Sequence, residues 1–489
     1  MEKKGFIAAL LVTSFLLVGC TPSKKEHEEE VVPPTPEVDP HSFKTIKERL
    51  NALDAVDSVS YLGTSKKFAS VYRVKFKQYI DHNNKKLGTF TQTVELGFNG
   101  FDKPNVYVSS GYMISDSNYS YSAGENELAF LLKSNYVFVE HRYFNESLPV
   151  DIDYDDPETW KYLTTAQAAA DAHEIVTQFK RILDGKWVST GASKGGMTTE
   201  LYAYYYPGEM DLYLPYVAPF CKSFADTRFF KFIYEEAGDL QYGETKAEQM
   251  RNDILSFQLK MLEWRDTLAP KFYQDGITMG CNYSSYATQD RIYDASVLEF
   301  GVGFWQYYQQ YSTITSCLKM SESTATQLAN KQNSFYQAFT GIITPEDVGM
   351  NNEFTPYYIQ AYQELGNYGY DFSYIRNALP EGVTLTVTEQ EETDLMWKLV
   401  MNESQLSIGH KELMEPKISN MLATTNDQFI ILYGSSDPWY SVRPEDVTNR
   451  DNISIYVNTH YPHTTSISNY DQMTKSEILN KIKTILEIA

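Results

Sequence analysis

The first feature of this 489-residue sequence that could do chemistry is a serine flanked by small residues. Ser193 is the central residue of GASKG at positions 191–195, which matches the pattern G-x-S-x-G. A strand-like run before it and a helix-like run after it form the context that a nucleophile elbow requires. In such a turn the positions two residues from the serine must be small so that strand and helix can pack, and Gly191 and Gly195 meet this need. A glycine-rich turn carrying a surface serine would explain the same residues.

Side chains that could activate the serine follow it in the chain. Serine is a weak nucleophile until a base removes its proton, and an acid must orient that base. Asp437 stands just after a strand-like run at 429–433 and could serve as the acid, or could simply begin a turn before Pro438. His460 and His463 are the histidines that follow this aspartate, and either could be the base. The order Ser, Asp, His is that of α/β-hydrolases.

Two backbone N–H groups should bind the oxyanion of the tetrahedral intermediate. In α/β-hydrolases one of them belongs to the residue after the nucleophile, which is Lys194 here. The other comes from the loop after an early strand, predicted here at 105–108. We predict Tyr112 as this second donor, with Gly111 as the alternative.

The elements that must position these residues alternate between strands and helices. Two runs, 71–80 and 89–97, are separated by polar turn residues and predict a hairpin. Short apolar strands and helices then alternate, which predicts the α/β class with an α/β-hydrolase core and a mostly parallel sheet. Residues 220–424 show apolar stripes at helical spacing and predict a large helical cap inserted into this core. The core itself is then formed by residues 41–219 and 425–489.

The amino terminus predicts export and lipid attachment. Residues 1–19 place two lysines before an apolar run that is too short to span a bilayer, which is the layout of a signal peptide. The run ends at Cys20 in LVGC, which resembles the bacterial lipobox, although a plain secretory signal is the alternative. Residues 20–40 are rich in proline and glutamate and predict a disordered tether. We therefore expect an extracytoplasmic protein of the cell envelope, lipid-anchored to the membrane.

Charge and cysteine usage exclude several partners. A formal net charge of −22 argues against nucleic acid, because affinity for nucleic acid comes largely from Lys and Arg. The sequence has no CxxC pair and no Cys/His spacing typical of metal sites, so we predict no metal and no other cofactor. Cys221, Cys281 and Cys317 could include one disulfide or remain three unpaired thiols.

Several long segments strongly resemble the bacterial prolyl tri/tetrapeptidyl aminopeptidases, which are serine peptidases. The similarity covers most of residues 100–470, and a looser one extends to the lysosomal prolyl carboxypeptidase and dipeptidyl peptidase II group. The resemblance implies that Ser193 is the nucleophile, Asp437 the acid and His463 the base. It also implies an exopeptidase that releases short peptides from free amino termini after proline. The segments that carry it are LTTAQAAADAHEIVTQFKRILDGKWVSTGASKGGMTTELYAYYYPGEMDLYLPYVAPF, VFVEHRYFNESLP, DASVLEFGVGFWQYY, YYIQAYQELGNYGYD and LYGSSDPWY.

Peptide substrates of this kind need two further subsites. The ammonium group of the substrate is most simply bound by a carboxylate, for which Glu235, Glu236 and Glu364 are candidates, although acids on a helix usually face solvent. Proline needs an apolar, aromatic-lined pocket. Candidate linings are Trp305, Tyr307, Tyr308 and Trp439.

Two other functions fit the same sequence. An esterase or lipase could use the same core and the same serine. A peptide-binding surface lipoprotein with an inactive hydrolase core would retain the tether without the chemistry.

Overall fold

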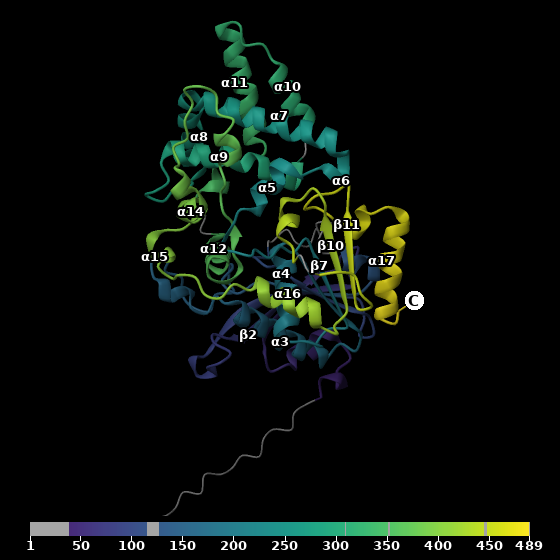
Figure 1. Cartoon of the computed structure of the whole chain (residues 1–489). Helices are drawn as coiled ribbons and strands as arrows, with labels where there is room; N and C mark the ends of the chain where they lie inside the picture. The colour runs from purple at the N-terminus through teal and green to yellow at the C-terminus, as the bar shows by residue number, and fades with distance from the viewer. Residues whose placement is uncertain (1–38, 115–126, 309, 351–352, 445–446, 489) are drawn as a thin grey trace, which may run out of the picture. The chain divides into compact units, whose positions relative to one another are not determined.

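The computed structural model describes residues 39–488, apart from 115–126, 309, 351–352 and 445–446 (Figure 1). The folded unit begins at Pro40. The predicted signal peptide, Cys20 and nearly all of the predicted tether lie outside the described residues.

A sheet in the order β1-β2-β3-β5-β4-β6-β7-β10-β11 forms the centre of the described chain. Its first three strands are antiparallel to their neighbours, and all pairs from β5 to β11 are parallel. This strand order, with a parallel core and an antiparallel edge, is that of an α/β-hydrolase and confirms the predicted fold class. The strands are β1 (Val56–Gly63), β2 (Ser70–Tyr79), β3 (Thr89–Phe98), β4 (Asn105–Ser109), β5 (Asn135–Val139), β6 (Trp187–Ala192), β7 (Leu212–Tyr216), β10 (Phe429–Gly434) and β11 (Ile453–Asn458).

The predicted hairpin is present, with Ser70 of β2 opposite Phe98 of β3 and Tyr79 opposite Thr89. Strand β1 pairs with β2 but was not predicted. None of its residues is fully buried, so the sequence carries no alternation between an apolar and a polar face that would reveal it.

Helices cover both faces of the sheet because the central strands are buried on both sides. Along β4, Val106 and Val108 pack with α2 and α17, whereas Tyr107 packs with α3 and α4 on the opposite face. These helices are α1 (Ile46–Asn51), α2 (Glu127–Leu132), α3 (Thr165–Lys180), α4 (Lys194–Tyr205) and α17 (Gln472–Ile485).

Between β7 and β10 the described chain is mainly helical, as predicted. Figure 1 shows α7, α10 and α11 gathered away from the sheet, whereas α16 lies beside α4. Helix α16 packs against α4, so this last helix of the 220–424 segment covers the core sheet. The helices are α5 (Arg228–Glu235), α6 (Asp239–Tyr242), α7 (Glu244–Glu263), α8 (Arg265–Met279), α9 (Gln289–Gly303), α10 (Tyr311–Lys319), α11 (Ala325–Thr340), α12 (Thr355–Gln360), α13 (Ser373–Arg376), α14 (Glu389–Val400), α15 (Glu403–Leu406) and α16 (Glu415–Thr424).

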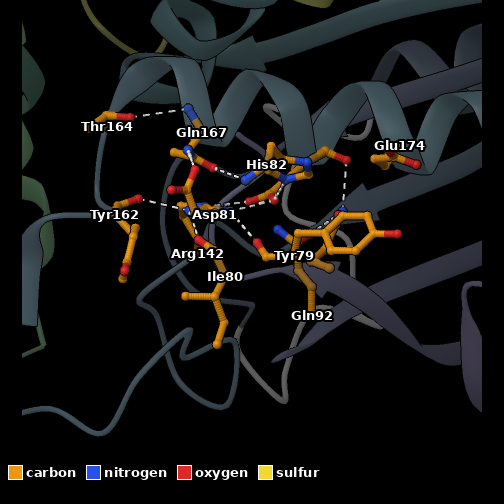
Figure 2. Close-up of polar contacts among 12 residues, drawn as sticks. Tyr79, Ile80, Asp81, His82, Gln92, Arg142, Tyr162, Thr164, Gln167 and Glu174 are labelled. Atoms are coloured by element: carbon orange, nitrogen blue, oxygen red, sulfur yellow. Dashed lines mark hydrogen bonds and ion pairs between the residues drawn. The ribbon is translucent and has the colours of Figure 1, made fainter. Parts of the chain in front are cut away.

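A buried arginine ties the hairpin to the parallel core (Figure 2). Arg142 follows β5, and two of its guanidinium nitrogens each donate to a different oxygen of Asp171 on α3, at 2.7 Å. His82 Nε2 lies 2.7 Å from the same carboxylate. Because Arg142 is fully buried, its remaining donors must also be satisfied. They bind the backbone carbonyls of Tyr162, Ile80 and Tyr79, at 2.8, 3.3 and 3.3 Å.

We predict that Arg142→Met lowers the free energy of unfolding by about 3–5 kcal/mol, because it leaves the buried Asp171 without its guanidinium partner. Urea unfolding followed by circular dichroism measures this loss. Lys161→Met is the control, since Lys161 forms an exposed ion pair with Glu158. Equal losses in the two variants would contradict this role of Arg142.

Candidate active site

The backbone around Ser193 has the geometry of a nucleophile elbow. Ser193 lies between β6 and α4 with φ +55° and ψ −120°, a conformation that side-chain-bearing residues rarely adopt. Its N–H donates to the carbonyl oxygen of Tyr216, at 2.9 Å. A Cβ on Gly191 would come within 2.5 Å of the Gly195 backbone, and one on Gly195 within 2.4 Å of Ser109 O. The steric reason for the two glycines therefore holds in the structure.

The fold brings His463 to Asp437. The Nδ1 of His463 lies 2.7 Å from Asp437 Oδ2, and the side chains are 6 % and 1 % exposed. Because the carboxylate accepts the Nδ1 proton, Nε2 is the ring nitrogen left to accept a proton. The other carboxylate oxygen accepts the N–H of Trp439, at 3.1 Å. His460 instead lies on the exposed side of its loop, where its Nδ1 is 3.0 Å from Thr459 Oγ1, so the geometry favours His463 as the base.

A glycine and a turn of the cap hold the His463 loop in place. A Cβ on Gly434, the last residue of β10, would lie 2.1 Å from Pro462 O, so only glycine lets this loop lie against the strand end. The N–H of His463 donates to Gln306 O, at 3.2 Å, in a π-helical turn at Phe304–Tyr308. The Tyr307 ring packs edge-to-face on the imidazole, with centroids 5.7 Å apart. The candidate base is thus positioned by core and cap together.

The loop after β4 lies against the start of α4, where an oxyanion site is expected. Gly111 has φ +75°, and a Cβ there would come within 2.6 Å of Gly195 N. The loop is fixed on its other side by the N–H of His141, which donates to Tyr112 O at 2.9 Å. The N–H of Tyr112 itself donates to Ser110 Oγ, at 3.1 Å, and would have to exchange this bond to bind an oxyanion. The loop thus offers two candidates for the second donor beside Lys194, the N–H of Tyr112 after this exchange and the N–H of Gly111.

The three glutamates predicted to bind a substrate ammonium group lie in different environments. Glu235 and Glu236 are exposed, and Glu235 accepts a hydrogen bond from Tyr374. Glu364 accepts the N–H of Thr165 at 2.6 Å, so its carboxylate caps the start of α3. These contacts give none of the three a direct link to Ser193.

Glu299 is a buried acid that the sequence reasoning missed. It lies on α9, is 6 % exposed, and burial raises its pKa to about 7, with Tyr370 and Tyr368 hydrogen-bonding to it. Ring contacts link it to the candidate catalytic residues by two routes. Tyr368 packs against Trp439, next to the Asp437 turn, with centroids 5.6 Å apart. The signal in the sequence is an acid inside the apolar run VLEFGVGFW at positions 297–305.

The second route runs through the oxyanion loop. The ring of Tyr112 lies 5.7 Å from that of Tyr357, which lies 5.2 Å from that of Tyr358. Tyr358 is in turn close enough to Glu299 to feel its charge, because burial first and the Glu299 carboxylate second raise the pKa of Tyr358. Glu299 thus stands at the far end of a layer of half-buried rings that begins beside Lys194, the residue after the serine.

The residues predicted to line a proline pocket also lie in different environments. Trp305 is fully buried against Phe304 and is a core residue. Tyr307 is 49 % exposed beside His463, and Trp439 is half-buried against Phe229. The side chain of Tyr308 lies outside the described residues.

Within the described residues, no group of three or more His, Cys, Asp and Glu side chains is arranged to hold a metal ion. Cys221, Cys281 and Cys317 are free thiols. No helix in the described part of the chain has the length and apolar character needed to cross a membrane.

A model of the PS-10 peptidase S37 family matches residues 39–383. The chain belongs to this family of serine peptidases. It is 28 % identical over 291 residues to a prolyl tri/tetrapeptidyl aminopeptidase of Streptomyces mobaraensis. The aligned region covers 60 % of this chain and 56 % of that protein. A human lysosomal Pro-X carboxypeptidase is 37 % identical over 86 residues, or 17 % of either protein. These matches confirm the resemblance seen in the sequence.

Solved structures are similar at a lower level. A proline iminopeptidase from Mycobacterium smegmatis is 11 % identical, with a TM-score of 0.36, over 82 % of this chain and 96 % of that one. The chain spans little more than half the length of the Streptomyces relative that it matches.

We predict that Gly434→Ala slows labelling of this S37 family member by a fluorophosphonate about 100-fold, because the new methyl group displaces the loop that carries His463. The labelling rate is measured by gel fluorescence. Gly341→Ala is the control, since Gly341 has a negative φ and a Cβ there would approach only its own helix. A Gly434→Ala rate equal to that of the control would show that the loop tolerates the side chain.

Proposed function

We propose that this protein is an extracytoplasmic serine exopeptidase that releases tri- and tetrapeptides from free amino termini, after proline, through an acyl-enzyme. The observation that supports it most is the 2.7 Å hydrogen bond between His463 and Asp437, on a core whose Ser193 stands in a strained elbow. The S37 family membership and the Streptomyces relative support the peptidase class and the proline preference.

In the proposed reaction each of the three side chains has one role. Ser193 Oγ attacks the carbonyl carbon on the proline side of the cut bond while His463 Nε2 takes the hydroxyl proton. The Lys194 N–H and an N–H of the Gly111–Tyr112 loop bind the resulting oxyanion. The histidine then gives its proton to the leaving amine, and the C–N bond breaks. Water, deprotonated by the same histidine, adds to the acyl-enzyme and releases the peptide as a carboxylic acid.

The free amino terminus of the substrate is bound by Glu299 in this proposal. Its carboxylate is buried and its pKa lies near 7, so an incoming ammonium group would supply the positive charge that a buried carboxylate needs. The half-buried rings between Ser193 and Glu299 offer an apolar surface for the residues before the cut, including proline. Glu364 is not required, because its carboxylate already binds the Thr165 amide.

Location is proposed from the sequence. The signal-like run, LVGC and the acidic, proline-rich segment before Pro40 together support lipid attachment at Cys20 and residence in the cell envelope. Palmitate labelling of cells that carry the wild type or Cys20→Ala tests this attachment. Equal labelling of the two proteins would contradict it.

We predict that Ser193→Ala lowers the hydrolysis of X-X-Pro chromogenic substrates at least about 1,000-fold, and that His463→Ala does the same. His460→Ala is the matched control and should keep wild-type activity, because its ring contacts Thr459 rather than Asp437. Loss of activity only in His460→Ala would assign the base to that residue. Hydrolysis of short esters but of no peptide would favour an esterase, and an absence of both reactions would favour a binding protein.

We predict that Glu299→Gln raises the KM for X-X-Pro substrates with a free amine about 10- to 100-fold. Glu364→Gln should leave KM unchanged. In the wild type, KM should fall as the pH rises through about 7, because the carboxylate must ionise to bind ammonium. Steady-state kinetics with free and acetylated substrates measure these effects. A Glu299→Gln enzyme that still discriminates fully against acetylated substrates would refute this role.

A further inference from the structure

A buried lysine directly follows the candidate nucleophile in the chain. Lys194 is 2 % exposed, although it is the first residue of α4 after Ser193. Its Nζ donates to the carbonyl oxygen of Gly111, at 2.7 Å. The ring centroids of Tyr112 and Phe144 lie 5.6 and 6.0 Å from the same nitrogen. The amine is therefore enclosed by the oxyanion loop and by two aromatic faces.

This burial is unfavourable for a lysine. Within the described residues no carboxylate forms an ion pair with it, and burial lowers its pKa to about 7. Three titratable residues, Glu140, His141 and Arg142, follow β5 and line the same small cavity as Ser110 and Gly111 of the oxyanion loop. The buried His141 and Arg142 carry like charge when protonated, and Arg142 is bound to Asp171. Glu140 is occupied by hydrogen bonds from Ile114 N, Asn145 and Ser147. An apolar side chain would fill this space at lower cost.

The Lys194 side chain binds Gly111 O, a carbonyl of the oxyanion loop, so this hydrogen bond can affect catalysis as well as stability. A trans peptide is planar, so Gly111 C=O and Tyr112 N–H point in opposite directions from one rigid plane. Holding the carbonyl therefore fixes the direction of the Tyr112 N–H and restrains the backbone of Gly111, so it acts on both candidate donors. Packing alone leaves the loop less constrained, because a cavity of about 20 Å³, room for one water, lies beneath Ser110 and Gly111.

We propose that the Lys194 side chain is a positioning residue of the oxyanion site, which orients the Gly111–Tyr112 peptide through Gly111 O while the Lys194 backbone N–H supplies a donor. Lys194 thus acts on both parts of the site. Its backbone N–H is the donor on α4, and its side chain orients the peptide in the loop after β4. This inference rests on the proposed acyl transfer at Ser193. The ammonium form donates a stronger hydrogen bond than the neutral amine and places its charge one peptide unit from the oxyanion.

Lys194→Met tests the inference because it keeps the length of the side chain and removes the donor. The kcat on X-X-Pro substrates should fall about 10- to 100-fold with little change in KM. The affinity for a peptide aldehyde, whose tetrahedral adduct carries an oxyanion, should fall by a similar factor. Lys331→Met is the matched control, since Lys331 is 6 % exposed in the cap and pairs with Glu322. This control should lose stability but keep its kcat.

An unchanged kcat in Lys194→Met, beside an active wild type, would overturn the inference whatever happens to the unfolding temperature. A wild type that cleaves no substrate would instead refute the proposed function. If Lys194→Met does not fold, Lys194→Arg decides, because arginine keeps a donor and stays charged at every working pH. The ratio of its kcat to that of the wild type should rise as the pH passes through about 7, where the native amine loses its proton. A ratio that is flat across this range would overturn the inference.

Discussion

The contact between three backbone segments at Ser193 is the constraint on which the site depends. The end of β6, the start of α4 and the loop after β4 approach so closely that Gly191, Gly195 and Gly111 leave no room for a Cβ. This contact holds the serine at a positive φ and places the loop amides beside the first amide of α4. The strain is sustained by a sheet whose central strands are buried on both faces, and by Arg142 and Asp171, which fix the hairpin to α3.

Core and cap have different roles in this arrangement. The core supplies Ser193, Asp437 and His463 from the carboxyl ends of its strands, as parallel α/β sheets commonly do. The cap reaches the same point through Gln306 and Tyr307, which contact the His463 loop. Farther from the serine, the cap carries Glu299 beneath a layer of tyrosine rings. In the proposed function, a short peptide with a free amine needs both parts to bind productively.

The sequence predicted the parts of the fold that have strong local patterns. The hairpin, the alternating strands and helices, and the elbow glycines all follow from periodicity and from the small size of specific residues. Strand β1 was not predicted, because neither of its faces is buried. Residue type and position do not distinguish His460 from His463 as the base, since both histidines follow β11. Only the folded chain shows that Gly434 leaves room for the loop that brings His463 to Asp437. The burial of Glu299 and of the Lys194 side chain was not predicted, because whether a charged group is buried depends on the tertiary structure.

The central claim is that Ser193 is an activated nucleophile. Its most direct measurement is mass-spectrometric mapping of the protein after brief exposure to a fluorophosphonate or to a peptidyl-proline phosphonate. We expect one added phosphonyl group, found on Ser193 within GASKG and absent from His463→Ala over the same time. A label on another residue, or a label on Ser193 that forms equally fast without His463, would contradict it.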